Sequence, residues 1–201
     1  MNFPRAFPVL ETARLRLRPY ALADAPKVQR LAGEKAVAAT TASLPHPYPD
    51  GAAAVWIATH AAKWADHEEM IFAITLKGSG EMLGAIGLVL SPAHEKAELG
   101  YWMGLPYWNK GYASEAARAV IDCGFRSLGL NRIQAHHMAV NPASGRVMEK
   151  AGMTREGVSP QALKKTGQFH DLVFYGVLRR DWPGLPESTP AIPGLPDNDP
   201  S

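Results

Sequence analysis

The sequence predicts a mixed α/β domain with a largely antiparallel central sheet flanked by helices. Strand-like runs joined by short turns occupy the first half, and strand, helix, strand, helix and strand alternate in the second half. The chain has 201 residues, 46% hydrophobic and 20% charged, which suffices for one buried core. We assign residues 1–182 to this domain. Residues 183–201 hold six of the 17 prolines, at positions 183, 186, 190, 193, 196 and 200, and are predicted to form a flexible tail.

Residue spacing places the first elements of the chain. Period-two alternation predicts a strand at 15–18, and an apolar pattern after the capping Asp24 predicts a helix at 23–33. Three prolines make 43–51 a loop, and a second helix runs from Asp50 to about residue 66. The residues expected on its buried face are Trp56, Ile57, His60, Ala61 and Trp64.

Three β-rich runs follow the second helix. The runs 70–76 and 81–90 are separated by Lys77-Gly78-Ser79-Gly80, which is typical of a β-hairpin. Residues 97–103 form the next predicted strand. Gly100 inside it predicts a β-bulge or the close approach of another group.

Helix signals are strongest in the second half. Apolar residues at helical spacing predict a helix over 112–128, with Cys123 as a half-buried, inert thiol beside the apolar stripe. Asn141 as a cap and Pro142 at the first helical position begin a short helix that ends near Gly152. The remaining strands are predicted at residues 132–140, 154–158 and 170–178.

Composition excludes several classes of function. Lys plus Arg is 21 and Asp plus Glu is 19, so the net charge is 21 − 19 = +2, and without a basic run we expect no nucleic-acid partner. A single cysteine excludes a disulfide framework, and the adjacent His136 and His137 of one strand point to opposite faces, so we expect no metal. No apolar run is long enough for a bilayer and no signal peptide is visible, so we expect a cytoplasmic protein without a membrane partner.

The segment Trp108–Ala113 joins a strand to the strongest helix. The first amides of a helix have no intrahelical partner, and the helix dipole adds partial positive charge there. Gly111 leaves room for the backbone to approach a ligand, and Lys110 adds a full charge. This junction is therefore a candidate cradle for a pyrophosphate.

The same junction belongs to a series of motifs in a fixed order along the chain: Glu98-Leu99-Gly100-Tyr101-Trp102, Trp108 to Ala116, Asn141-Pro142-Ala143-Ser144 and Glu149-Lys150-Ala151-Gly152-Met153. Together with Glu11–Arg18 and His170–Tyr175, they resemble the motifs of the GNAT acyltransferase superfamily, in particular its RimJ/RimL-like branch. The resemblance covers residues 9–182. It implies a GNAT-like fold and acetyl-CoA, or another acyl-CoA, as cosubstrate.

The resemblance also implies where the cosubstrate binds. The pantetheine arm would lie between the strands at 97–103 and 132–140, with the pyrophosphate on the amides of residues 109–114. Trp108 stands where the family carries Arg or Gln, although Trp is frequent in the RimJ/RimL-like branch. The implied cofactor-binding residues are Leu99, Gly100, Tyr101, Trp108, Asn109, Lys110, Gly111, Tyr112, Ala113, Ser114 and Asn141.

Two residues are candidates for catalysis. Glu98 is the leading base or amine-steering carboxylate, and Ser144 matches a serine proposed to protonate the thiolate in RimL-like proteins. A backbone N–H near residues 99–101 would stabilise the oxyanion. The helix after Asn141 lacks the Tyr that many GNAT enzymes use, and Leu163 stands where some RimL-like sequences carry a catalytic Glu.

The predicted function is acetyl-CoA-dependent N-acetyl transfer to a primary amine by direct attack on the thioester. The acceptor is either a protein N-terminus or a small amine such as an aminoglycoside, a polyamine or an amino-acid derivative. It is expected to be bound by residues 45–51, the second helix and a loop at 159–169. A degenerate acyl-CoA-binding module without turnover is the alternative, and a homodimer is left open.

Overall fold

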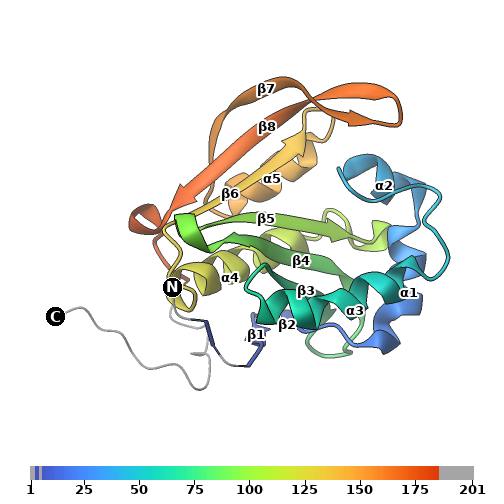
Figure 1. Ribbon diagram of the computed structural model, residues 1–201, viewed down its shortest axis with the longest axis horizontal. Coiled ribbons are helices and arrows are strands. Elements are labelled where there is room, and N and C mark those ends of the chain that lie inside the picture. Colours follow the sequence, from blue (N-terminus) through green and yellow to red (C-terminus); the bar gives the residue numbers. More distant parts are fainter. Residues whose placement is uncertain (1–2, 5, 186–201) are drawn as a thin grey trace.

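The computed structural model describes residues 3–4 and 6–185, and the rest of the proline-rich segment lies outside these residues. One eight-stranded sheet forms the centre of the molecule, in the order β1-β2-β3-β4-β5-β6-β8-β7 (Figure 1). All neighbouring strands are antiparallel except β5 and β6, which confirms the predicted fold class. The strands are β1 (Leu10–Glu11), β2 (Leu15–Arg18), β3 (Glu69–Leu76), β4 (Met82–Ser91), β5 (Lys96–Met103), β6 (Arg132–Met138), β7 (Thr154–Lys165) and β8 (Gln168–Leu178).

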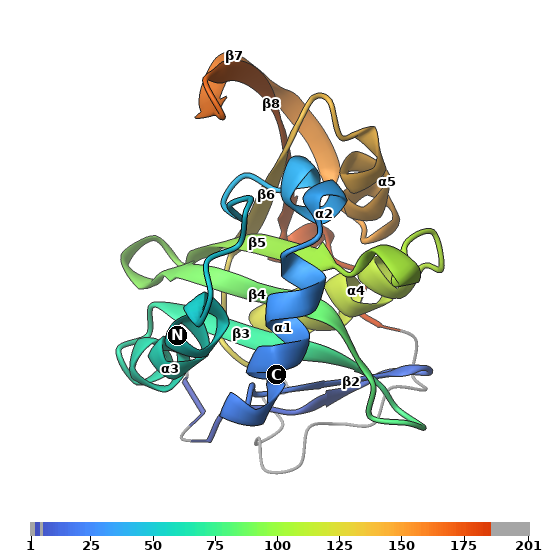
Figure 2. The same ribbon diagram turned by 90° about the vertical axis from the view of Figure 1, so that its right-hand side faces the viewer.

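Helices cover both faces of the sheet. Helices α4 and α5 lie on one face, and α1 and α3 lie on the other (Figures 1 and 2). Neighbouring residues of a strand therefore enter different cores: Phe72 packs with the α4 side and Ala73 with the α1 side. The helices are α1 (Ala25–Ala32), α2 (Lys35–Thr40), α3 (Ala52–Ala65), α4 (Tyr112–Arg126) and α5 (Pro142–Lys150).

The sheet opens between β5 and β6. The two parallel strands are paired only at Lys96↔Arg132, Ala97↔Ile133 and Glu98↔Gln134. Beyond Glu98, β6 continues its pairing with β8, while β5 continues its pairing with β4. Among residues 3–4 and 6–185, no strand pairs with this edge of β5 from Leu99 onward, and a V-shaped opening begins there.

Of the two alternatives predicted for Gly100, a β-bulge or the close approach of another group, the β-bulge is wrong. The register of β4 and β5 runs without a shift from Gly84↔Met103 to Ser91↔Lys96. A Cβ at Gly100 would have no atom within 4 Å, so open space lies beside this residue. The separation of two strands, and not a bulge within one pair, therefore exposes the edge of β5.

Local sequence signals account for most of the other elements. The β3–β4 hairpin forms where predicted, and α5 begins at Asn141, whose side chain accepts a hydrogen bond from the N–H of Ser144. Gly152 ends α5 with a φ of 90°, a conformation that favours glycine. The helix predicted at 23–33 is divided into a 3-10 turn at Leu22–Asp24 and α1.

Several expectations are corrected. The predicted loop at 159–169 is largely strand, because β7 and β8 form a long hairpin around Thr166 and Gly167. Ala61 is exposed, although it was expected on the buried face of α3. Cys123 is fully buried at 2% exposure, and burial raises the pKa of its thiol to about 12. No helix within the described residues is long and apolar enough to cross a membrane.

Candidate active site

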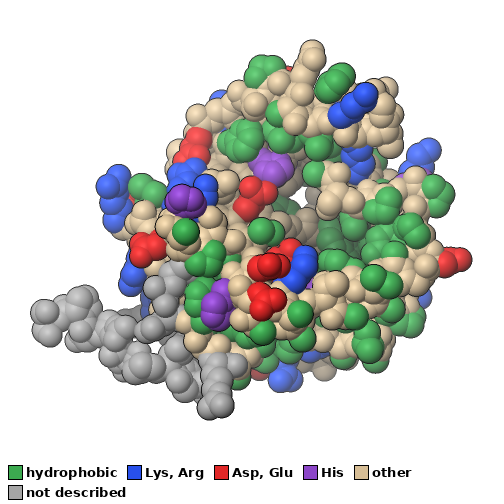
Figure 3. Space-filling view, viewed as in Figure 1, with side chains coloured by type: hydrophobic (Ala, Val, Ile, Leu, Met, Phe, Trp, Pro, Cys, Tyr) green, Lys and Arg blue, Asp and Glu red, His purple; other side chains and the backbone are tan. Residues whose placement is uncertain are grey.

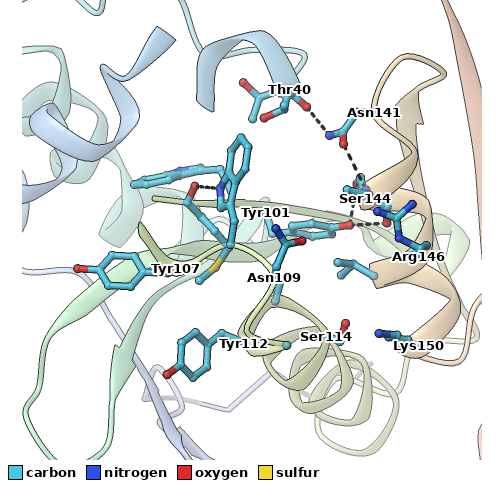
Figure 4. A pocket seen from close by; sticks show the side chains of 18 residues that line it. Thr40, Tyr101, Tyr107, Asn109, Tyr112, Ser114, Asn141, Ser144, Arg146 and Lys150 are labelled. Carbon is cyan, nitrogen blue, oxygen red and sulfur yellow. Dashed lines mark hydrogen bonds between the residues drawn. The ribbon is translucent and has the colours of Figure 1, made fainter. Parts of the chain in front are cut away.

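A cavity of about 260 Å³ lies at the sheet opening (Figure 4). Its walls come from the end of β5, the loop before α4, the first turn of α4, the face of α5 and the end of α2. Eight predicted cofactor-binding residues line it, together with Ser144: Tyr101, Trp108, Asn109, Gly111, Tyr112, Ala113, Ser114 and Asn141. The opening of the sheet and the start of α4 thus meet in one cavity.

The backbone before α4 turns so that helical amides face the cavity. Asn109 and Gly111 have φ values of 60° and 78°, and α4 begins directly after Gly111. Asn tolerates this left-handed conformation better than most residues, and glycine adopts it without steric cost. Within the described residues, no side chain caps the N-terminus of α4. Its first-turn amides are therefore free to bind an anion.

Side chains hold this loop in place from behind. The Trp108 indole donates a hydrogen bond to the Met103 carbonyl at 2.8 Å. Arg14 donates to the Lys110 carbonyl at 3.0 Å, forms a 2.6 Å ion pair with Glu115 and lies 4.6 Å over the ring of Tyr112. Burial raises the pKa of Glu115, but the hydrogen bonds from Thr12 and Arg14 together lower it by more than burial raises it. The pKa is therefore below its usual value, and the carboxylate stays ionised. No local sequence pattern indicates the role of Arg14, which lies about 100 residues away from this loop in the chain.

Two hydroxyl groups meet inside the cavity. The hydroxyl oxygens of Tyr101 and Ser144 lie 2.7 Å apart, and Tyr101 also donates to the Ser144 carbonyl at 3.0 Å. Burial raises the pKa of Tyr101 well above its usual range, so the phenol keeps its proton. The Asn141 side chain donates to the carbonyl of Thr40 at 3.0 Å. These bonds connect β5, α5 and α2 around the cavity (Figure 4).

Glu98 lies outside the lining of the cavity. Its carboxylate pairs with His136 at 3.3 Å and accepts a hydrogen bond from Gln134 at 3.3 Å. The bond to His136 is the main reason that the pKa of Glu98 is lowered and that of His136 is raised. Along β5, the side chain of Glu98 faces the same side of the sheet as Gly100 and Trp102.

The remaining predicted residues also lie outside the lining. Leu99 is buried at 3% exposure in the main core, and Lys110 is exposed. Gly100 borders the open space beside β5. His136 and His137 face opposite sides of β6, as predicted: His136 contacts Glu98, whereas His137 is buried beside Tyr175. Among the described residues, no group of three His, Cys, Asp or Glu side chains is placed to hold a metal ion.

Sequence reasoning missed two basic residues of the site. Arg146 and Lys150 line the cavity from α5, and neither takes part in an ion pair within the part of the chain that the structure describes. Their spacing of four residues places both on one helix face. That spacing was a usable signal once α5 had been predicted. Thr40 and Thr41 were also missed because the six-residue α2 was not predicted.

Residues 14–154 match the family described as the acetyltransferase (GNAT) domain. The chain belongs to the GNAT acetyltransferase family. This GNAT protein is 32% identical over 174 residues to the uncharacterized N-acetyltransferase YoaA of Bacillus subtilis, a match that spans 86% of this chain and 98% of YoaA. It is 37% identical to the putative ribosomal N-acetyltransferase YdaF of Bacillus subtilis, over 52% of this chain and 58% of YdaF.

Solved structures share the GNAT fold. A GNAT-family acetyltransferase from Bacillus anthracis superposes with a TM-score of 0.76 at 26% identity, covering 86% of this chain and 99% of the other. RimL, a ribosomal L7/L12 alpha-N-protein acetyltransferase solved in complex with coenzyme A, gives a TM-score of 0.78 at 18% identity, covering 85% and 97%. At that identity, the likeness to RimL establishes the fold. The GNAT protein is therefore an N-acetyltransferase by family, with relatives among ribosomal-protein acetyltransferases.

Proposed function

We propose that this protein transfers an acetyl group from acetyl-CoA to a primary amine by direct attack of the amine on the thioester. The observation that carries the proposal is the continuity between the sheet opening after Glu98 and the uncapped N-terminus of α4. The extended arm that carries the thioester fits the sheet opening, and the diphosphate of coenzyme A fits the N-terminus of α4. The coenzyme A in the RimL structure adds support from a protein of the same fold.

The chain offers a separate group for each part of coenzyme A. The amides of residues 109–114 and the free cations Arg146 and Lys150 would bind the phosphates. The free edge of β5 at residues 99–101 would bond to the amides of the pantetheine arm, with Asn141 on the opposite wall. A backbone N–H of the same edge would stabilise the oxyanion, which typically contributes about 10²–10³-fold in rate.

The hydroxyl pair suits protonation of the leaving thiolate. Ser144 and Tyr101 lie on the two walls of the cavity and are joined by a hydrogen bond. A Tyr on the helix after Asn141 is absent from this sequence, but Tyr101 supplies a protonated phenol from β5. This arrangement supports turnover and weighs against a degenerate module that only binds acyl-CoA.

The amine must lose a proton before it attacks. At pH 7, the neutral form costs about 1.4 kcal/mol for an α-amino group with a pKa near 8, and about 4.6 kcal/mol for a lysine with a pKa near 10.4. Glu98, held ionised beside His136, is proposed to steer the amine or to accept its proton through water. A single carboxylate as base suits the α-amino group, because deprotonation of this group costs less free energy than deprotonation of a lysine. The site therefore favours a protein N-terminus as acceptor over a lysine side chain.

The acceptor is proposed to approach from the face that carries Glu98 and Gly100. The molecule is hollowed on this side, below the β7–β8 hairpin (Figure 3). Residues 45–51, α3 and the tip of the β7–β8 hairpin are proposed to bind the acceptor. A protein N-terminus is our leading acceptor because relatives include the putative ribosomal N-acetyltransferase YdaF and the ribosomal protein uS5-alanine N-acetyltransferase of Escherichia coli, which is 34% identical over 43% of its length. Small amines form the second class, and we propose a cytoplasmic location.

An acceptor screen tests the proposal. The full chain is mixed with acetyl-CoA and a panel of peptides with different N-termini, polyamines and aminoglycosides, and both thiol release and the mass of each acceptor are measured. Acetylated product with one acceptor class supports the proposal. Tight coenzyme A binding by calorimetry without any product would instead favour the acyl-CoA-binding module.

A further inference from the structure

A lysine at the tip of the β7–β8 hairpin bridges the two halves of the opened sheet. Its ammonium donates hydrogen bonds to the carbonyls of Ala38 at 2.6 Å, Leu44 at 3.2 Å and Thr41. This lysine, Lys165, belongs to the β6–β8 half, whereas the three carbonyls belong to α2 and the segment after it. The hairpin extends toward α2 in Figure 1. We call these three bonds the Lys165 clasp.

The hairpin is shaped so that its tip reaches α2. The register of β7 and β8 shifts between Ser159 and Leu163, which bends the distal part of the hairpin. Within this irregular stretch, Gln161 has a φ of 51°, and its N–H donates to the Asp171 carboxylate at 2.8 Å. The hydrogen bond between Gln161 and Asp171 therefore stabilises the bend, and the bend directs the end of β7 away from the rest of the sheet.

The clasp matches the needs of both partners. An ammonium has three donors, and each of them meets one carbonyl here. In the described part of the chain, the carbonyl of Ala38 accepts only the N–H of the C-cap residue Thr41 from the backbone, at 3.3 Å, so the ammonium adds a second, charged donor at the end of α2. No other side chain of the described residues bonds to the carbonyls of Ala38, Thr41 and Leu44 apart from the Thr41 hydroxyl, which donates to that of Ala38.

The clasped segment is a wall of the cavity. Thr40 and Thr41 line it, and the carbonyl of Thr40 accepts a hydrogen bond from Asn141, which caps the helix that carries Ser144. In Figure 4, Thr40 and Asn141 lie at one end of the site, while Ser114 and Lys150 lie at the other. The clasp thus acts at the end that holds the hydroxyl pair, away from the proposed phosphate cradle.

We propose that Lys165 is a positioning residue for acyl transfer, which fixes Thr40 and Thr41 against the sheet opening and so limits the bulk of the amine that can enter as acceptor. This inference rests on the proposed function. Without the ammonium, α2 loses its tie to the hairpin, the wall becomes mobile, and the acceptor is held less well, while the phosphates of coenzyme A keep their contacts at the start of α4.

The test compares Lys165→Met with its neighbour Lys164→Met. The first variant keeps the aliphatic stem and removes the three donors. The control removes a lysine that lies over the ring of Phe169 at 5.3 Å and makes no bond to α2. Both are assayed with acetyl-CoA, a short peptide with a free N-terminus and a bulky branched amine, and hydrogen exchange is followed at residues 38–44.

We expect Lys165→Met to raise the KM for the peptide about fivefold, with a smaller change in the KM for acetyl-CoA, a smaller preference for the peptide over the branched amine, and faster exchange at 38–44. Lys165→Arg should restore part of the preference, because it keeps the charge and the donors. An unchanged KM for the peptide, an equal rise in both KM values, or the same effect in Lys164→Met would overturn the inference. A wild-type protein that acetylates no amine would instead defeat the proposed function.

Discussion

The hydroxyl groups of Tyr101 and Ser144 lie 2.7 Å apart and connect the two walls of the sheet opening. Tyr101 lies on β5, and Ser144 lies in the first turn of α5. Because the two residues are separated by 43 positions in the chain, only the folded sheet brings them together. In the proposed mechanism, this pair would donate a proton to the leaving thiolate.

Removal of either hydroxyl should therefore slow turnover. We expect Ser144→Ala and Tyr101→Phe each to lower kcat by about 10²-fold, the lower range for general acid catalysis, with little change in coenzyme A affinity. The double variant should lose little more than either single variant, because both changes break one bond. Steady-state kinetics and calorimetry measure the two quantities. Unchanged turnover in Ser144→Ala would remove this residue from the mechanism.

A larger residue at position 111 should distort the phosphate cradle, because its Cβ would come within 3.4 Å of the Arg14 guanidinium that supports the loop. Gly111→Val places a branched side chain at a φ of 78°, next to the amides that face the cavity. We expect coenzyme A affinity to fall by at least about tenfold. Gly80→Val is a matched control, because Gly80 has a φ of 70° in the distant β3–β4 turn. It should lower stability in a similar way without changing affinity, and equal affinities in both variants would argue against the cradle.

The two cations of α5 should contribute to binding through charge. We expect Arg146→Gln and Lys150→Gln each to weaken coenzyme A binding about three- to tenfold, and each to reduce its dependence on salt concentration. Titration calorimetry at two ionic strengths checks both effects. Arg155→Gln on the exposed edge strand β7 serves as the control, since it removes a positive charge that does not line the cavity. If that control weakened binding as much, the effect would come from net charge and not from the site.

The pair of Glu98 and His136 predicts a pH dependence of stability. The raised pKa of His136 gives stability that is present below pH 6.5 and lost as the pH rises through that pKa in the folded protein. The lowered pKa of Glu98 gives stability that is present above pH 4.5 and lost as the pH falls through its folded value. His136→Gln should therefore lower the free energy of unfolding most between pH 4.5 and 6.5 and least above pH 8.

The size of this effect should be small. The side chain of Glu98 is 40% exposed and that of His136 is 24% exposed, so solvent screens the pair, and we expect less than about 1 kcal/mol. Urea unfolding at pH 5.5 and pH 8.5 makes the comparison. A larger loss at pH 8.5 than at pH 5.5 would show that the pair is not the source of the effect.

Elements with strong local signals were predictable from the sequence. The glycine-rich turn of residues 77–80, the apolar stripe of α4 and the Asn141 cap each depend on neighbours within a few positions. The six-residue α2 lacks such a stripe, and the outer part of β7 is largely exposed, so no alternation marks it as a strand. Their geometry is set by contacts such as those of Lys165, over 120 residues from its partners.

The parts of the candidate site that depend on local sequence were predictable, and the parts that depend on contacts between distant residues were not. The motif at 108–114 indicated the loop before α4, because a glycine at a helix start has a local meaning. The expectation of a bulge at Gly100 was wrong because a single strand does not reveal which neighbours it keeps. The hydrogen bond from Tyr101 to Ser144 and the support of Arg14 behind Gly111 required the tertiary structure.

Three residue pairs join β5 to β6, so the sheet consists of two halves that are connected by a short paired segment. Side chains from β5, α5 and β7 connect the far ends of the two halves, and those of Asn141 and Lys165 reach backbone carbonyls of α2 and of the turn after it. An extended ligand between β5 and β6 would make the backbone hydrogen bonds that a ninth strand would otherwise make. The unpaired part of the sheet is therefore the part that a bound ligand can complete, and we expect the two halves of the sheet to become more rigid when the ligand is bound.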